Sequence, residues 1–369
     1  MRKSFKYRIK PTKKQATQLQ GTLNECRWLY NHLLEQRKTA WEERHEGLTL
    51  YGQEKTFTLL KTERPSLETV YSQVLQNAAV RIDLAFKAFF RRVKAGETPG
   101  YPRFRGFDRY DSFTYPQPGF GWKLEGNTLK LSKIGKVRIV LHRPIEGTPK
   151  TCTIKRSSTG KWFVCFSCEV EVAPLPASSE TVGIDVGLIS FATFSTSEAI
   201  PVPKFFRKDE KDLARKQRKL SKAENVTPER KKARKVVSKI HERIANRRRD
   251  FAHQQSRKIV NRFGTICIED LEVNRMLHNH CLAKSISDAA WSQFAQFIEY
   301  KAVYAGTRKV VRINPAYTSQ DCSSCGHRQK MPLSNRIYTC PCCGLEIDRD
   351  HNAALNILRL GLQTIGGNP

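Results

Sequence analysis

The sequence predicts an α/β domain combined with a β-barrel and a helical lobe. Short apolar runs that end in a carboxylate alternate with helical stretches in the second half of the chain, which is typical of an α/β sheet. Alternating hydrophobicity in the first half predicts strands on both sides of a long helical region. Two Cys-x-x-Cys pairs near the C-terminal end predict a small metal-bound finger. A chain of 369 residues is long enough for roughly two to four such units.

The first half combines strand and helix patterns. Residues 3–9 carry apolar side chains at every second position, which predicts a strand, and helical spacing begins at about Lys13. A second long helix is expected from Ser66 to about Lys94. Residues 112–172 return to strand patterns. Together with the first strand they predict one β-barrel that a helical insert interrupts.

The second half begins after a Pro- and Ser-rich linker near residue 175. Residues 181–195 predict a buried strand, a turn and a second strand. The expected order then continues with basic helices at about 206–222 and 228–262, a strand at 265–271, a helix around Trp291, a strand at 309–315 and a final helix at 352–360.

Basic residues dominate the composition. The chain has 65 Lys and Arg against 35 Asp and Glu, and its net charge of +30 favours a polyanionic partner, with nucleic acid as the first candidate. Between Lys204 and Asp250 there are 19 basic and 7 acidic residues, yet Val236 and Ile240 belong to a helical apolar stripe. The stretch therefore predicts an amphipathic helix with one core face and one cationic face. Candidate nucleic-acid contacts on it are Arg243, Arg247 and Arg248.

Membrane and secreted classes are not favoured. No stretch approaches the roughly 18 apolar residues of a transmembrane helix. The charged N-terminal segment has no apolar core after it, so no signal peptide is expected. The expected location is cytoplasmic, where the 11 cysteines would serve as thiols or metal ligands instead of disulfides.

Two further segments have a composition suited to nucleic acid. Residues 100–110 are rich in Gly, Arg and aromatic side chains, so Arg103 and Arg105 are candidate contacts, although an ordinary surface loop explains the composition equally well. The helix segment SQVLQNAAVR offers amides suited to adenine edges, with a merely polar helix face as the alternative. The candidates on or near that face are Gln73, Gln76, Asn77 and Arg81.

Three carboxylates occupy positions suited to metal binding. Asp185 and Glu269 each end a buried strand, and Asp350 precedes the final helix, where it is also suited to cap the helix N-terminus. Side chains at the carboxyl ends of strands often converge, and three carboxylates can hold two divalent cations roughly 4 Å apart, with Mg²⁺ as the natural choice. Asp270 would face the opposite way on a continuing strand, whereas Asp348 remains an open alternative to Asp350.

The cysteine pairs predict a structural zinc site. Fourteen residues separate the two pairs, which is near the spacing of a four-thiolate site without an open coordination position. The expected ligands are Cys322, Cys325, Cys340 and Cys343. Gly326 and Gly344 follow the pairs and permit tight turns, whereas Cys342 is an extra thiol. Cys165 and Cys168 lie three apart in a predicted hairpin, on opposite faces, and are not expected to bind metal.

At this point the chain resembles a known family over nearly its whole length. From residue 183 onward it carries GIDVGL, IEDL, TSQDCSSCG, CPCCG and DRDHNAALNI in this order, and its N-terminal part carries KYRIKPTKKQ, ECRWLYNHLL, VLQNAAVRIDLAFKAFF and PRFRG. This arrangement is similar to the transposon-encoded TnpB proteins. Those proteins are compact RNA-guided DNA endonucleases and relatives of the type V CRISPR effectors.

The resemblance implies a bilobed protein with a RuvC-like nuclease domain of RNase H-type fold. It matches Asp185 to the first family carboxylate, Glu269 to the second, and Asp350, the Asp before x-Asn-Ala-Ala, to the third. The implied cofactors are two Mg²⁺ (or Mn²⁺) ions and one structural Zn²⁺. The implied domains are a wedge-like β-barrel (1–10 and 105–172), a helical recognition lobe (11–104), the nuclease domain (176–315 and 346–369) and a zinc-finger insertion that binds target nucleic acid (316–345).

The resemblance also implies the partners. A guide RNA from the transposon end, expected to bind one protein chain, would pair with one strand of a double-stranded DNA target beside a short target-adjacent motif. One site would then cut both strands, with the protein at the nucleoid of a prokaryotic cell when on target. Two rival hypotheses remain: a non-cleaving guided or DNA-binding regulator, and a guide-independent RuvC-like resolvase or transposase.

Overall fold

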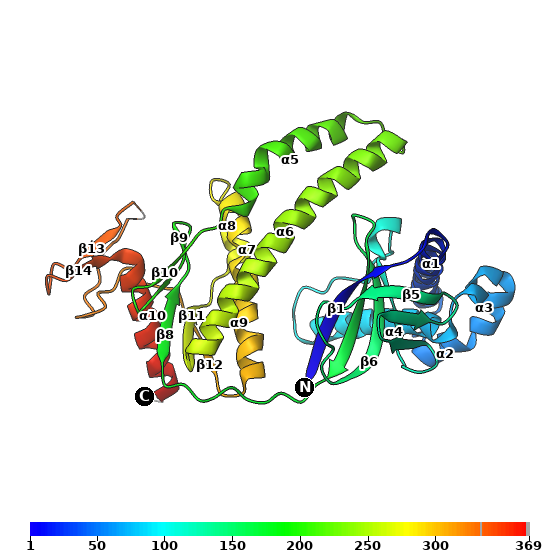
Figure 1. Ribbon diagram of the computed structural model, residues 1–369, viewed down its shortest axis with the longest axis horizontal. Helices are drawn as coiled ribbons and strands as arrows, with labels where there is room; N and C mark the ends of the chain where they lie inside the picture. Colours follow the sequence, from blue (N-terminus) through cyan, green and yellow to red (C-terminus); the bar gives the residue numbers. More distant parts are fainter. Residues whose placement is uncertain (333, 367–369) are drawn as a thin grey trace. The chain divides into compact units, whose positions relative to one another are not determined.

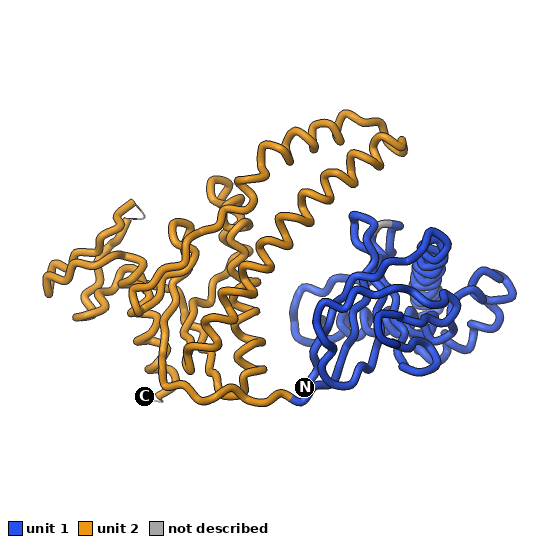
Figure 2. The backbone as a smooth tube through the Cα atoms, viewed as in Figure 1, with its two compact units in different colours: residues 1–171 blue, residues 172–369 orange. Residues whose placement is uncertain are grey.

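The chain forms two compact units, residues 1–171 and 172–369 (Figure 2). The computed structural model describes residues 1–332 and 334–366. Each unit has its own sheet and its own helices, and the two are described separately. No helix in the described ranges is long and apolar enough to cross a membrane.

A seven-stranded, nearly closed sheet forms the centre of the first unit. Its strand order is β2-β6-β7-β1-β5-β4-β3, with antiparallel pairs throughout. The first strand of the chain lies in the middle, which confirms that strands from both sides of the helical insert share one barrel-like sheet. The strands are β1 (Arg2–Lys10), β2 (Ser112–Tyr115), β3 (Trp122–Glu125), β4 (Thr128–Leu131), β5 (Gly135–Val140), β6 (Thr148–Arg156) and β7 (Trp162–Glu169).

The helical insert lies between β1 and β2. Its helices are α1 (Lys13–Arg44), α2 (Leu50–Lys55), α3 (Phe57–Glu63) and α4 (Ser72–Lys94), with short 3-10 turns η1 (Pro65–Thr69) and η2 (Phe107–Arg109). The long helix expected from Ser66 begins only at Ser72. Val70 is buried in an extended conformation with ψ of 139°, which separates η1 from α4.

A five-stranded sheet of order β10-β9-β8-β11-β12 forms the centre of the second unit. Its first three strands pair antiparallel, whereas β8, β11 and β12 run parallel. The strands are β8 (Thr181–Asp185), β9 (Ser190–Phe194), β10 (Ala199–Pro201), β11 (Thr265–Glu269) and β12 (Lys309–Ile313), and β13 (Ile337–Thr339) pairs with β14 (Glu346–Asp348) as a separate ribbon. The short edge strand β10 was not expected.

Helices cover both faces of this sheet (Figure 1). The helices of the unit are α5 (Phe205–Lys222), α6 (Pro228–Arg262), α7 (Val273–Met276), α8 (Ala283–Ala289), α9 (Trp291–Ala305) and α10 (Arg349–Gly366). Ile184 and Ile268 point to one face and join a core with α6 and α9. Gly183 and Cys267, one position earlier, point to the other face and meet α10.

Two glycines allow α10 to lie directly on the sheet. A Cβ atom on Gly183 would overlap the carbonyl oxygen of Ala354, and one on Gly361 would overlap the Cys267 sulfur. The sheet and the helix each supply one of these glycines. The helix and the sheet are therefore closer than a side chain at either glycine would permit. This contact places the start of α10 beside the end of β8.

The basic helices α5 and α6 form an antiparallel pair that extends beyond the sheet (Figure 1). Leu213 of α5 packs against Ile240 and Ile244 of α6, which confirms an apolar stripe within the cationic run. The sequence assignment of Val236 to this stripe is wrong, because Val237 is buried there and Val236 is 39% exposed. Adjacent valines lie about 100° apart on a helix, and only the partner helix decides which one is covered.

The α10 contact can be tested with glycine variants. Gly183→Ala and Gly361→Ala should each destabilise the protein by about 1–3 kcal/mol or more, because α10 must move off the sheet. Gly21→Ala is the matched control, since its Cβ would meet nothing within 4 Å in α1 and should stabilise by roughly 0.5–1 kcal/mol. Thermal unfolding measures all three. Equal stability of Gly183→Ala and wild type would contradict the close contact.

Candidate functional site

The first two candidate carboxylates lie side by side at the end of parallel strands. The register pairs Ile184 of β8 with Ile268 of β11, so Asp185 and Glu269 follow at equivalent positions. Neighbouring strands are about 4.8 Å apart, and side chains at equivalent positions share a face. That face is the one covered by α10.

The third carboxylate, Asp350, lies in the first turn of α10. An Asp350 oxygen lies 3.8 Å from the place where a Cβ on Gly187 would be, so it reaches the turn that follows Asp185. Asp348 has another role, since its Oδ1 accepts a hydrogen bond of 2.9 Å from the backbone N–H of His351. The expectation that Asp350 caps the helix is therefore wrong: Asp348 caps it, and Asp350 faces the other carboxylates.

Burial disfavours ionisation of all three groups, and repulsion from the other two carboxylates adds to this effect at Asp185. Burial, followed by the charges of Glu269 and Asp350, raises the pKa of Asp185 well above its ordinary value. Burial raises the pKa of Glu269 to about 7, although a hydrogen bond from Thr318 acts in the opposite direction. Burial and the neighbouring Asp348 raise the pKa of Asp350.

Few cations of the protein offset this concentration of carboxylates. Within residues 1–332 and 334–366, no basic side chain forms an ion pair with Asp185. The charge of Arg349 lowers the pKa of Asp185, but by less than burial and the neighbouring carboxylates raise it. Arg336 lies 3.9 Å from Asp350. Desolvated carboxylates whose pKa values are raised are well suited to a divalent cation, which would supply the missing positive charge. The donor set is all oxygen, as Mg²⁺ requires.

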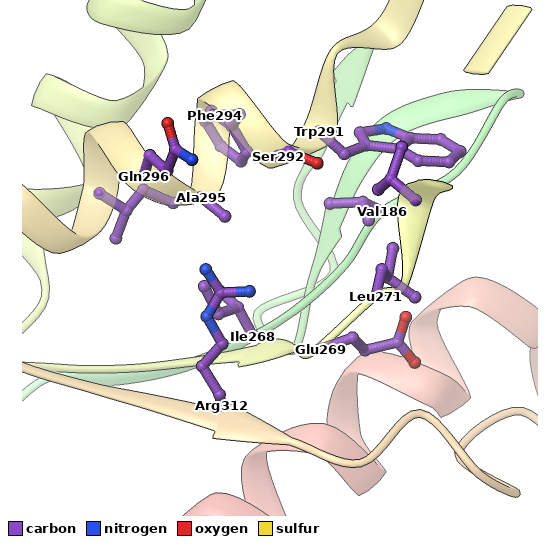
Figure 3. A pocket seen from close by; sticks show the side chains of 12 residues that line it. Val186, Ile268, Glu269, Leu271, Trp291, Ser292, Phe294, Ala295, Gln296 and Arg312 are labelled. Atoms are coloured by element: carbon purple, nitrogen blue, oxygen red, sulfur yellow. The ribbon is translucent and has the colours of Figure 1, made fainter. Parts of the chain in front are cut away.

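A pocket of about 220 Å³ opens beside Glu269. Figure 3 shows Glu269 and Arg312 on neighbouring strands at one side of it, with Trp291 and Phe294 on the other. Arg312 is held by Glu299 at 2.7 Å and by Asp270 at 3.0 Å. Asp270 thus faces away from Glu269, as expected. No signal in the sequence indicates this pocket, because Trp291 and Phe294 have the spacing of ordinary core residues.

The four expected zinc ligands do come together. The sulfurs of Cys322, Cys325, Cys340 and Cys343 all lie within 4.8 Å of one another. Among the described residues this is the one group of three or more potential metal ligands that meets that distance. Gly326 and Gly344 adopt positive φ angles of 77° and 73°, which confirms the tight turns. Cys342 and the Cys165–Cys168 pair lie outside the group, as expected.

The chemistry of this group suits a thiolate-bound ion. Burial raises the pKa of the Cys340 thiol. Hydrogen bonds from the N–H groups of Cys343 and Cys342 and from neighbouring thiols lower it by a larger amount, so the resulting pKa is about 6. Backbone N–H groups that point at sulfur stabilise the thiolate, which is the form that binds zinc. Four sulfur donors leave no open position, so a bound zinc ion would be structural.

The residues expected on the α4 face have different environments. Arg81 donates 2.6 Å and 3.0 Å hydrogen bonds to Ser112 and Thr114, so it ties α4 to β2. Gln73 donates to Gln117 at 2.7 Å. Gln76 is exposed and Asn77 is half-buried. The two latter amides are therefore the better placed to meet a ligand.

The arginines expected to contact nucleic acid on α6 already have internal partners. Arg243 and Arg247 pair with Asp209 of α5, and Arg248 pairs with Asp288 of α8 at 2.7 Å. These pairs brace the neighbouring helices against α6, while Arg243 and Arg247 remain about half exposed. In the first unit, Arg103 and Arg105 are exposed in the loop before η2.

Family profiles match three parts of the chain. A helix-turn-helix domain profile matches residues 1–46, the OrfB_IS605 profile, described as "Probable transposase", matches residues 165–280, and the Cas12f1-like TNB domain profile matches residues 291–357. The last range contains the whole cysteine group and Asp350.

Relatives match over almost the whole chain. A Streptomyces pristinaespiralis protein, provisionally named an RNA-guided DNA endonuclease, is 38% identical over 98% of this chain and 90% of its own length. Escherichia coli K12 InsQ, with the same provisional name, is 31% identical over 97% and 92%. The CRISPR-associated endodeoxyribonuclease Cas12f1 of Sulfoacidibacillus thermotolerans is 37% identical over 33% of this chain and 29% of its own.

A solved structure shares the fold. The protein of a Cas12f1–sgRNA–target DNA complex superposes with a TM-score of 0.61 at 16% identity, covering 92% of this chain and 81% of that one. Together with the carboxylates and the four cysteines, these matches define a class of transposase-associated proteins with a Cas12f1-like C-terminal domain. Within that class, the chain belongs to the TnpB family.

The cysteine site predicts one zinc ion per chain, measured by elemental analysis of the purified protein. Cys322→Ser or Cys340→Ser should lower the bound zinc and destabilise the finger, because a zinc ligand is lost. Cys342→Ser is the matched control and should retain the metal, since Cys342 is outside the sulfur group. Well-folded wild-type protein without zinc would refute the assignment.

The buried carboxylates predict a pH-dependent cost to stability. A carboxyl whose pKa is raised by folding destabilises the folded state increasingly as pH rises above its unfolded pKa. Without added Mg²⁺, Asp185→Asn should therefore raise the melting temperature by a few degrees at pH 8 and by less at pH 5. Saturating Mg²⁺ should remove the difference. A gain that changes with neither pH nor Mg²⁺ would contradict carboxylate repulsion as its cause.

Proposed function

We propose that this protein is an RNA-guided, divalent-metal-dependent endonuclease that cleaves double-stranded DNA. The DNA would be matched by a guide RNA from a transposon end and lie next to a short target-adjacent motif. The observation that carries the proposal is that Glu269 and Asp350 lie near enough to Asp185 for their charges to raise its pKa, in a chain of net charge +30. Relatives provisionally named RNA-guided DNA endonucleases, which the chain spans by nine-tenths or more, support it.

The five-stranded sheet would be the RuvC-like nuclease domain of RNase H type. Three antiparallel strands followed by two parallel ones, with Asp185 ending the first strand and Glu269 its parallel neighbour, support this assignment. We assign residues 176–315 and 346–369 to this domain and 316–345 to the zinc-finger insertion. The seven-stranded sheet (1–10 and 105–172) would be the wedge, and residues 11–104 the recognition lobe of a bilobed protein.

The carboxylates would hold two Mg²⁺ or Mn²⁺ ions. When bound, such ions polarise the phosphodiester and lower the pKa of water, which is the chemistry that hydrolysis needs. Asp185 and Glu269 would fix the spacing from adjacent strands, and Asp350 would complete the donor set from α10. No side chain of the site needs to act as a covalent nucleophile.

The cationic surfaces would hold the nucleic acids by their backbones. Sequence would then be recognised by pairing between guide and target, as in other RNA-guided nucleases. The candidate contacts with the nucleic-acid backbone are the exposed side chains of Arg103 and Arg105 and the half-exposed side chains of Arg243 and Arg247. Gln76 and Asn77 are the candidates for the target-adjacent motif. One protein chain is proposed per RNA.

A non-cleaving regulator is the second candidate function, and the intact carboxylate set argues against it. A regulator would bind matched DNA without producing ends whatever metal is added. A guide-independent resolvase would cut bare duplex without RNA. Sequencing the RNA that copurifies with the protein would identify the guide and therefore the target to use.

The proposal predicts metal-dependent cleavage by the purified protein–RNA complex. Matched duplex should be cut only with divalent metal, and Asp185→Ala or Glu269→Gln should leave no detectable product, because a metal ligand is lost. Asp270→Asn is the matched control: Asp270 is 66% exposed on the opposite face and should be dispensable for cleavage. Gel electrophoresis of labelled duplex reports the outcome. Full cleavage by Asp185→Ala would refute the proposed mechanism.

A further inference from the structure

A hydrogen bond joins the carboxylate site to the cysteine finger. The buried Thr318 hydroxyl donates to Glu269 Oε1 at 2.8 Å. Thr318 lies only four residues before Cys322, which is the first of the four metal-site cysteines. The residue that orients Glu269 and the residue that begins the finger thus belong to one short turn.

Contacts among residues 317–328 hold this turn in place. The backbone N–H groups of Gln320 and Asp321 donate to the Tyr317 carbonyl at 2.8 Å and 3.0 Å. Tyr317 has a positive φ of 66°, a strained conformation for a residue with a side chain. Arg328 compensates, because it pairs with Asp321 at 2.6 Å and 3.0 Å and stacks 3.7 Å from the Tyr317 ring.

Two buried asparagines on α10 hold the turn from the other side. Asn356 donates to the carbonyls of Thr318 at 2.9 Å and Asp321 at 2.7 Å. Asn352, one helical turn earlier, donates to the same Asp321 carbonyl at 2.8 Å and accepts from the Ser323 N–H at 2.9 Å. Both asparagines are fully buried, so losing either set of bonds would leave polar groups unsatisfied. The helix that carries Asp350 therefore also fixes the turn that orients Glu269.

We propose that Thr318 is a positioning residue for Glu269, and that metal binding in the cysteine finger strengthens divalent-cation binding at the carboxylates through residues 318–323. This inference rests on the proposed function, since it requires the carboxylates to hold the cations. The hydroxyl occupies one side of Oε1 and limits the rotation of the glutamate. The rest of the carboxylate is then presented in one orientation, which lowers the entropy lost when a cation binds.

The finger matters because a metal bound to its cysteines would close the loop that begins at this turn. Four sulfurs bound to one ion would lock Cys322 in place, whereas free thiols would leave the turn held by hydrogen bonds and the Arg328 ion pair without a metal bond. Any such coupling is reciprocal: if zinc tightens binding at the carboxylates, the second cation must tighten zinc by the same factor.

The test measures Mn²⁺ affinity and does not rely on cleavage. Mn²⁺ is titrated into the full-length, RNA-free protein, and the free ion is followed by electron paramagnetic resonance. Thr318→Val keeps the shape but removes the hydroxyl and should weaken Mn²⁺ binding on the order of tenfold. Thr318→Ser keeps the hydroxyl and should restore most of the affinity. Thr364→Val, which removes an exposed hydroxyl from α10, is the control and should equal wild type.

A zinc arm tests the coupling itself. Removing zinc should weaken Mn²⁺ binding severalfold, and reloading the finger with Cd²⁺, another thiolate-binding ion, should restore it. In the Thr318→Val background, zinc removal should have a smaller effect, because the connecting hydroxyl is already gone. An equal loss of Mn²⁺ affinity on zinc removal in both backgrounds would overturn the role of Thr318 as the connection.

The Asp185→Asn variant separates this inference from the proposed function. If Mn²⁺ binding is the same in Asp185→Asn and wild type, the carboxylates are not the metal site, and both proposals fail. If Asp185→Asn abolishes binding while Thr318→Val and zinc removal leave wild-type affinity unchanged, the metal site stands and the positioning role of Thr318 is overturned. Loss of affinity in Thr318→Val with recovery in Thr318→Ser supports it.

Discussion

The close contact between α10 and the five-stranded sheet is the constraint on which the second unit depends. Gly183 and Gly361 have no side chains that would separate the helix from the sheet. The backbone of Gly183 therefore lies against the backbone of α10 at Ala354, and the backbone of Gly361 lies against the Cys267 sulfur. The helix then has one possible height above β8. That height places Asp350 beside the turn after Asp185 and places Asn352 and Asn356 against the first knuckle of the finger.

The carboxylate site opposes folding in the absence of metal, which is typical of functional sites. Burial raises the pKa of Asp185, Glu269 and Asp350, and the charges of the other two raise that of Asp185 further, so the folded protein must either hold extra protons or bury repelling charges. The apolar core of α6, α9 and the sheet offsets this cost. Elsewhere, buried carboxylates such as Asp288 are paired with arginines and contribute to the architecture.

The basic residues serve two purposes that composition cannot separate. A net charge of +30 indicates a polyanionic partner, yet Arg81, Arg243, Arg247 and Arg248 all bond within the protein. Arg81 holds a helix to a strand, whereas Arg243 and Arg247 brace α5 and still expose about half of their side chains. Charge counting therefore identifies the kind of partner, and only the contacts show which cations remain available to it.

The sequence by itself determined the local features whose cause is local. Alternation and helical spacing predicted most strands and helices, and the Cys-x-x-Cys spacing predicted the four sulfurs that meet, because such knuckles close within a few residues. Tertiary structure decided what depends on distant segments. It buried Val237 instead of Val236, gave the capping role to Asp348 and so turned Asp350 toward Asp185, and joined Thr318 to Glu269. Hydrogen bonds and burial between residues far apart in the chain leave no periodic signal in sequence, so packing alone selects among neighbours that look equivalent there.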